Sequence, residues 1–178
     1  MTPEIEIRDA TVQRLSRLSR YGSPARIRKS FLLPTKDSEV PCALVYFAGS
    51  SMTAEGDANA GEPTFVHSLR LVVSSLIKAN ASEALDGELD DAAAEILDTL
   101  LSDASWLALF DGVPQIERSY QLAADEPKRL VMAEARTIFT IEFRTEWPPT
   151  VVDDFTAVTL RTDDGPEAIA AEFTLPHP

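Results

Sequence analysis

The sequence predicts an α+β fold, with a mostly antiparallel sheet of about four to five strands, two principal helices packed on it and a C-terminal extension. Three observations lead to this prediction. Two stretches repeat apolar residues at helical spacing, and several others alternate apolar and polar residues as half-buried strands do. The two strongest late strand patterns are adjacent along the chain, which favours antiparallel pairing. Helices and strands therefore form separate layers around one core.

The first predicted helix starts at Thr2 and Pro3, which suit the N-cap and the first helical position. Gly22, followed by Ser23-Pro24, is a typical stop. The apolar residues that recur at helical spacing, and that we expect to face the core, are Ile5, Val12, Leu15 and Leu18.

Three strand patterns follow the first helix. The short "FLLP" piece at 31–34 predicts an edge strand, and "CALVYFAG" at 42–49 predicts a buried strand that ends at Gly49. A loop of small and polar residues, Gly49–Thr64, comes next, and loops of this length are usually functional or disordered. A strand of about ten residues then starts at Phe65, and its core-facing residues are Phe65, His67, Leu69, Leu71 and Val73.

The acidic stretch Ser82–Asp103 predicts the second helix, with Ser82 or Asp86 at its cap. Its leucines, alanines and one isoleucine form a helical stripe, and its carboxylates fall outside that stripe. The spacing fails the calcium loop of an EF-hand, because the required glycine is replaced by Asp91 and the twelfth-position acid by Leu97. We therefore expect an acidic outer face and no metal or other cofactor.

The last strong pattern is an antiparallel hairpin formed by Gln115–Leu122 and Leu130–Arg144. The main domain is expected to span 1–147. Residues 148–178 form an extension, in which "FTAVTLRT" predicts one strand and "EFTLPHP" a short extended end.

The residues that most often carry chemistry do not form a recognisable catalytic pattern. The single cysteine, Cys42, lies in a buried strand pattern, and His67 lies on an apolar strand face, so both are predicted to be core residues. His177 lies next to the C-terminus. Trp106 and Trp147 lie at ends of elements and are expected to pack in the core or at an interface. The G-x-S-x-G motif and phosphate-binding glycine loops are missing, so we expect no enzyme.

Length and composition bound the class of protein. A chain of 178 residues can bury a core without disulfides or metal, and one cysteine with two histidines excludes common structural zinc sites. The first residues lack a secretory signal pattern, and no apolar run approaches the ~20 residues of a membrane span. A reducing cytoplasm is the expected compartment.

Charge is unevenly distributed along the chain. The net charge is −13, but residues 1–30 hold seven Lys or Arg and three acids, a net charge of +4, which leaves −17 for the remainder. Such a body repels nucleic acid, so specific DNA or RNA binding is not expected. The basic segment could meet an acidic surface of a partner, including a second copy. The residues expected at such contacts are Arg14, Arg17, Arg20, Asp91, Glu95, Asp98, Glu134, Arg136 and Arg144.

The order of elements resembles that of bacteriophage tail terminator proteins, minor tail proteins of lambda-like and related phages. The matching parts are "EIEIRDATVQRLSRL", "EVPCALVYFAG", "FVHSLRLVVSSLIKA", "LDGELDDAAAEILDTLL", "GVPQIERSYQL" and "ARTIFTIEFRTEW". The resemblance covers Glu4 to Trp147 and rests on order and pattern. It assigns no role to residues 148–178.

The resemblance implies a structural protein of the virion or of a prophage. Family members form a homohexameric ring that caps the tail tube, ends its polymerisation and offers a surface for head joining. The implied partners are other copies of the chain, the major tail tube protein and head-completion proteins, with DNA passing through the lumen. The implied location is the head-proximal end of the tail, after assembly in the host cytoplasm. The long loop and the two long late strands would contact neighbours or the tube.

Two other classes remain open from the residues alone. A small acidic secretion chaperone or other protein-binding module would form a dimer with an exposed apolar groove. A hydrolase would depend on His67 and nearby acids.

Overall fold

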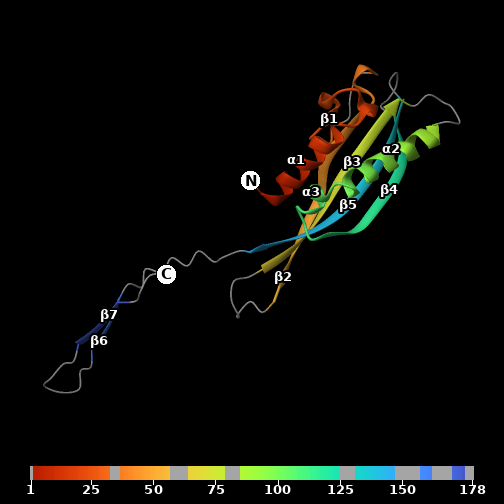
Figure 1. Ribbon diagram of the computed structural model, residues 1–178. Coiled ribbons are helices and arrows are strands. Elements are labelled where there is room, and N and C mark those ends of the chain that lie inside the picture. Colours follow the sequence, from red (N-terminus) through yellow and green to blue (C-terminus); the bar gives the residue numbers. More distant parts are fainter. Residues whose placement is uncertain are drawn as a thin grey trace. The chain divides into compact units, whose positions relative to one another are not determined.

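The computed structural model describes residues 2–32, 37–56, 64–78, 85–124, 131–146, 157–161 and 170–174. The chain divides into two compact units, Met1–Trp147 and Pro148–Pro178. In the second unit, strands β6 (Ala157–Arg161) and β7 (Ala170–Thr174) pair antiparallel. The first unit holds the remaining elements (Figure 1).

The first unit is built on a five-stranded sheet. Its strands are β1 (Ile27–Arg28), β2 (Cys42–Glu55), β3 (Thr64–Lys78), β4 (Gly112–Ala124) and β5 (Val131–Glu146). They lie in the order β1-β2-β3-β5-β4, and every pair is antiparallel except β1 with β2. The predicted α+β class, the mostly antiparallel sheet and the late hairpin are thereby confirmed.

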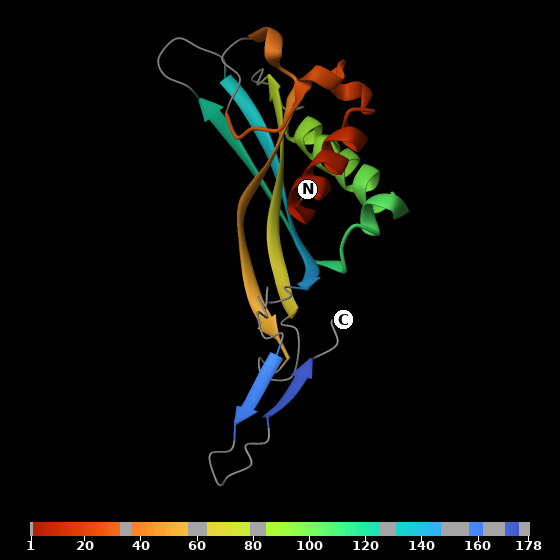
Figure 2. The same ribbon diagram turned by 90° about the vertical axis from the view of Figure 1, so that its left-hand side faces the viewer.

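Three helices cover one face of this sheet, here called the inner face (Figures 1 and 2). They are α1 (Pro3–Leu15), α2 (Leu85–Leu101) and the short α3 (Ala104–Leu107). Helix α2 follows its predicted stripe, because Leu89, Ala92, Ala93, Ile96 and Leu100 are buried. Single 3₁₀ turns occur at Ser19–Tyr21, Pro24–Arg26 and Asp37–Glu39.

Trp106 in α3 lies at the centre of the inner-face core. It is fully buried, and its ring meets the rings of Phe110 and Phe139 edge-on at 4.9 and 5.7 Å between centroids. Its indole Nε1 donates to Thr11 Oγ1 at 2.9 Å, and the Thr11 hydroxyl donates to the carbonyl of Ile7 at 2.7 Å. This chain of hydrogen bonds joins α3 to α1 inside the core and leaves the buried indole satisfied.

The buried face of α1 follows the prediction at Leu15 and differs from it nearer the start of the helix. Ile7, Thr11 and Leu15 are buried, whereas the predicted Ile5 is 37% exposed. The reason is the hydroxyl of Thr11, which accepts from Trp106 and so makes a polar position part of the core. The helix also ends at Leu15, earlier than predicted, although Gly22 still closes the following 3₁₀ turn in a left-handed conformation.

Two strand predictions in the first half need correction. Phe31 and Leu32 of the "FLLP" piece lie outside any strand, and the edge strand consists of Ile27–Arg28 instead. Strand β2 does not end at Gly49. A β-bulge between Phe47 and Gly49 inserts Ala48 into the strand, and pairing with β3 continues to Glu55. The predicted long loop is therefore partly strand, and 57–63 lies outside the described residues.

The extended β2 and β3 form an arm that runs past the helices (Figure 2). Every residue of β2 from Ala48 onward is exposed, in contrast to the buried Cys42–Val45 at its start. The pairs Met52 with His67 and Glu55 with Thr64 continue the ladder along this arm. The β2 side of the arm is thus held mainly by backbone hydrogen bonds, whereas the β3 side still buries His67 and Leu69.

The outer face of the sheet is apolar at one end only. There, Val40, Cys42, Leu44, Leu76 and Met132 form a small buried cluster, with Tyr46 packed against it. Phe31, in the segment after β1, meets Tyr46 edge-on at 6.5 Å.

Candidate functional site

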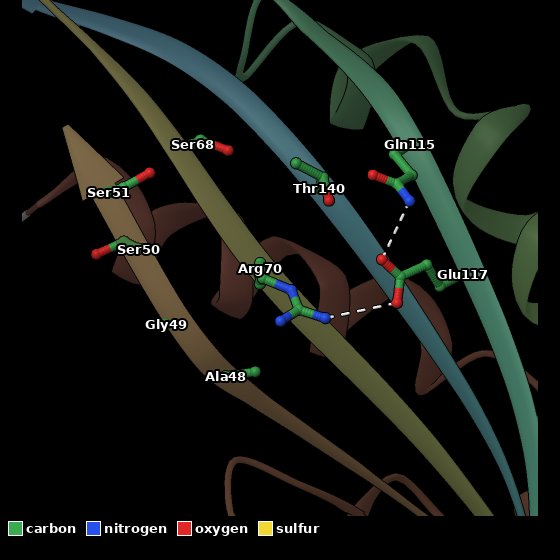
Figure 3. Close-up of a pocket in the computed structure, with 9 residues that line it drawn as sticks. All are labelled: Ala48, Gly49, Ser50, Ser51, Ser68, Arg70, Gln115, Glu117 and Thr140. Atoms are coloured by element: carbon green, nitrogen blue, oxygen red, sulfur yellow. Dashed lines mark hydrogen bonds and ion pairs between the residues drawn. The ribbon is translucent and has the colours of Figure 1, made fainter. Parts of the chain in front are cut away.

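The outer face carries a polar hollow of about 450 Å³ at mid-sheet (Figure 3). The bulge at Ala48 and Gly49 and the small side chains around it leave this space open. The lining side chains come from β2, β3, β4 and β5 and are Ala48, Gly49, Ser50, Ser51, Ser68, Arg70, Gln115, Glu117 and Thr140.

Arg70 supplies the positive charge of this hollow. Its guanidinium reaches across the sheet to Glu117 at 3.5 Å, and Gln115 donates to the other oxygen of Glu117 at 3.1 Å (Figure 3). Both partners of the ion pair are nearly half exposed, so the pair adds little stability. Hydroxyls, an amide and an exposed charge pair can hydrogen-bond a polar surface, and nothing in the hollow activates a nucleophile.

Arg144 fastens the far end of the arm, where β2 ends at Glu55. Its guanidinium donates hydrogen bonds to both carboxylate oxygens of Glu55, at 2.8 and 3.2 Å, and a third to Asp111 at 2.8 Å. The hydrogen bonds from Arg144 lower the pKa of Glu55, and the two carboxylates raise the pKa of Arg144. A predicted contact residue is thus engaged within the chain, where it ties β2 and the start of β4 to β5.

Glu134 and Arg136, also predicted at contacts, form a buried polar network on the outer face. Glu134 accepts from Ser74 at 2.6 Å, from Gln121, and from Arg136 at 3.0 and 3.2 Å. Burial, the largest single influence, raises the pKa of Glu134, but the combined hydrogen bonds and the Arg136 charge outweigh it and lower the pKa. The network joins β3, β4 and β5 and leaves Arg136 one-third exposed.

Arg14 of α1 and Arg20 of the following 3₁₀ turn pair with acids of the same chain. Arg20 Nε lies 2.8 Å from Glu95, and Arg14 Nε lies 2.9 Å from Asp103. Asp103 also caps α3 by accepting from the backbone of Trp106 and from Ser105. These hydrogen bonds, chiefly that from Ser105, lower the pKa of Asp103 to about 2. The predicted Arg20–Glu95 attraction therefore exists inside one subunit.

The other predicted charges on the helices stay at the surface. Arg17, Asp91 and Asp98 are exposed, and within the described ranges the structure gives their side chains no ionic partner. They stay available for an intermolecular contact, which remains a prediction.

A second hollow, of about 270 Å³, lies between the start of α2 and strand β4. We call it the α2–β4 groove. The Tyr120 hydroxyl donates to Asp90 at 2.6 Å beside it, which raises the pKa of Tyr120. The groove is lined by Leu85, Asp86, Leu89, Tyr120, Gln121 and Leu122.

His67 is a core residue, as predicted, and it is fully engaged. Its ring stacks on Phe143 at 4.5 Å between centroids, Nε2 lies 2.6 Å from Thr145 Oγ1, and Nδ1 lies 3.9 Å from Glu4. An acid, an imidazole and a hydroxyl in series are the parts of a hydrolytic relay. The imidazole is 7% exposed, however, and lines none of the hollows described above. Its contacts instead join α1 to the sheet.

Cys42 is buried, and burial raises the pKa of its thiol to about 11, which makes it a poor nucleophile at neutral pH. Trp106 belongs to the core, as expected. Trp147, His177 and Ser82 lie outside the described residues.

Within the part of the chain that the structure describes, no three His, Cys, Asp or Glu side chains converge as metal ligands would. No helix there has the length and apolar character needed to cross a bilayer.

No protein-family model matches the chain, and no curated protein matches it.

The sequence prediction missed both hollows. Several residues lining them lie in the long loop and the late strands that were predicted to make contacts, but none is among the charged residues named individually as contacts. The signal for the outer-face hollow was present in β3, where Ser68 and Arg70 alternate with core residues. The groove gave a weaker signal, because Tyr120 and Leu122 look like ordinary core residues until the neighbouring helix is placed.

Proposed function

We propose that the chain is a structural protein of the bacteriophage tail terminator type, which assembles as a ring on the end of a tail tube. The observation that supports this is the order of elements. A helix, a long antiparallel arm, an acidic helix and a second antiparallel hairpin follow one another along the chain. The strands of the arm and of the hairpin belong to one sheet. This is the order on which the resemblance rests.

Two further features fit such a role. The arm of β2 and β3 extends past the helices and can reach a partner, and the sheet has two edges on opposite sides of the subunit. Ring assembly needs two different patches on each subunit, since a head-to-tail contact joins unlike surfaces.

Electron micrographs and native mass measurements of the purified protein test the ring directly. We expect closed rings of one size. In a phage or prophage that encodes the chain, deletion of the gene is expected to give tails of uncontrolled length that do not join heads. Tails of normal length in the deletion strain would contradict the proposal.

The arm can be tested separately. Met52, on the arm, is 57% exposed, and Met52→Glu is expected to weaken binding to tail tubes at least tenfold while rings still form. Leu107→Glu, at another exposed apolar position, on α3 and away from the arm, is the matched control. Equal tube binding by both variants would remove the arm from the proposal.

A protein-binding module is the second candidate, and the α2–β4 groove is the observation that favours it. This alternative predicts a dimer whose groove takes up a segment of another protein. A native mass of two chains, together with an absence of rings, would favour it over the terminator.

A further inference from the structure

Apart from Met52 on the arm, the most exposed apolar side chains among the described residues gather at opposite edges of the sheet. Phe31 and Leu32, which follow the edge strand β1, are 71% and 66% exposed. Leu122 and Tyr120, on the other edge strand β4, are 64% and 43% exposed. Large apolar side chains exposed together commonly mark a surface that is covered by a partner.

The β4 side offers a receptor for an extended segment. Leu122 and Tyr120 line the α2–β4 groove, and Asp86 and Asp90 stand at its rim. Beside the groove, Gln115–Ala124 pairs with β5 along one edge, and no described strand pairs with the other edge. An unpaired edge of ten residues is a template for another strand unless it is covered.

The segment after β1 has the opposite character. Arg26, Arg28 and Lys29 precede the exposed Phe31 and Leu32. Arg28 and Lys29 meet Glu39 and Asp9 of their own chain at 3.4 and 2.7 Å. These are partly exposed ion pairs, which contribute little and can exchange partners at little cost.

Charge complementarity favours a contact between these two surfaces. Residues 1–32 hold seven Lys or Arg and three acids, a net charge of +4, whereas α2 holds six acids and no base, a charge of −6. Arg14 and Arg20 are already paired within the chain. The segment 26–32 is therefore a better candidate than the face of α1 for the basic side of the contact.

We propose that Phe31 and Leu32 of one copy occupy the α2–β4 groove of a neighbouring copy, with the preceding Arg and Lys residues facing the acidic rim. The two surfaces are different and lie at opposite edges, so the contact is heterologous and joins subunits head to tail. This inference deepens the proposed ring and rests on that proposal for its closure.

Complementary loss-of-contact variants test the inference. F31S/L32S removes the inserted side chains, and Leu122→Glu blocks the groove with a carboxylate beside Asp86. Each variant alone is expected to be monomeric by native mass spectrometry, with assembly at least tenfold weaker than in the wild type. An equimolar mixture is expected to form heterodimers and nothing larger, since one intact segment meets one intact groove. Met52→Ser, a change at another exposed apolar site, is the control and is expected to assemble normally.

Three outcomes would overturn the inference. They are wild-type-like assembly by either variant, the absence of heterodimers in a mixture whose members keep the wild-type melting temperature, and a monomeric wild-type chain at high concentration. As an independent check, a Leu32→Cys, Leu122→Cys chain is expected to form oligomer ladders on oxidation. The buried Cys42 can stay in place, because a single-cysteine wild-type control reports its reactivity.

Failure of this contact and failure of the proposed function give different results. If rings form through other surfaces and still control tail length, only the contact is wrong. If the chain assembles through this contact but the deletion strain makes normal tails, the contact is right and the tail role is wrong.

Discussion

The two faces of the five-stranded sheet differ in how they are closed. The inner face is apolar along most of its length and is covered by three helices, with Trp106 and Phe139 fully buried. The outer face is apolar only around Cys42 and Leu76, and it opens at mid-sheet into a hydroxyl-lined hollow. The difference indicates that the inner face provides most of the stability, while the outer face, the arm and the edges are free for contacts.

Trp106→Ala tests the inner face and has the largest expected effect. The substitution empties the centre of the core and removes the donor to Thr11. We expect the free energy of unfolding to fall by about 3–5 kcal/mol, as for other buried aromatic truncations. Urea denaturation followed by circular dichroism measures it. A loss below about 1 kcal/mol would contradict the assignment of this face as the main source of stability.

Glu134→Gln tests the only part of the outer face that is both polar and buried among the described residues. A charged acceptor of three side chains is replaced by a neutral amide, so we expect a loss of about 2 kcal/mol at pH 7. The folded-state pKa of Glu134 is lowered, so its stabilising effect is present above the ordinary carboxyl pKa and is lost as the pH falls through the folded value.

The difference in unfolding free energy between wild type and Glu134→Gln should therefore shrink from pH 7 to pH 3. Urea titrations at both pH values measure this difference. The contributions of the other carboxylates to the pH dependence largely cancel in it, because both proteins contain them. A difference that is constant with pH would mean that the Glu134 charge does not contribute. Glu142→Gln, a change at a half-buried carboxylate on the same strand, is the control.

Thr11→Val sharpens the description of the inner face. The change keeps the side-chain shape but leaves the buried Trp106 Nε1 without its acceptor. The expected loss is about 1.5 kcal/mol, from the cost of an unpaired buried donor. Thr11→Ser keeps the hydroxyl and is the control. Equal stability of Thr11→Val and wild type would show that the hydrogen bond is not needed for α3 to pack on α1.

Arg70→Ala has the smallest expected effect. Its pair with Glu117 is long and exposed, so the free energy of unfolding should change by less than about 0.5 kcal/mol. Thermal melting at low and high salt checks this. A loss above about 1 kcal/mol would mean that the outer-face hollow is part of the stability of the fold and is not simply an open surface.

The sequence was sufficient for the elements whose side chains repeat regularly. The stripe of α2 and the alternation of β3 and β5 gave the fold class and most of the core, because a single periodicity decides which face is buried. Thr11 could not be predicted as a core residue, since its acceptor role depends on Trp106, 95 positions away. The two hollows also depend on which elements meet, and periodicity alone does not give that.

Local signals misled the prediction at two places. Gly49 looked like the end of a strand, but the bulge uses its positive φ of 152° within the strand. Arg14, Arg17 and Arg20 were expected to meet the acids of α2 in a neighbour, but Arg20 pairs with Glu95 inside the subunit and Arg14 pairs with Asp103, an acid beyond α2.

The bulge at Ala48 changes which residues of β2 lie on the same face of the sheet. Before the bulge, Tyr46 pairs with Val72, and beyond it Gly49 pairs with Arg70. Even-numbered residues of β2 therefore lie on the outer face before the bulge, and odd-numbered residues lie on it beyond the bulge. Deleting this one residue would leave Gly49 opposite Arg70, so the side chains that follow would stay on their present faces and the buried Cys42–Val45 would not move. The bulge is therefore the position at which β2 can lose a residue while both its buried start and the contact surface of the arm keep their faces.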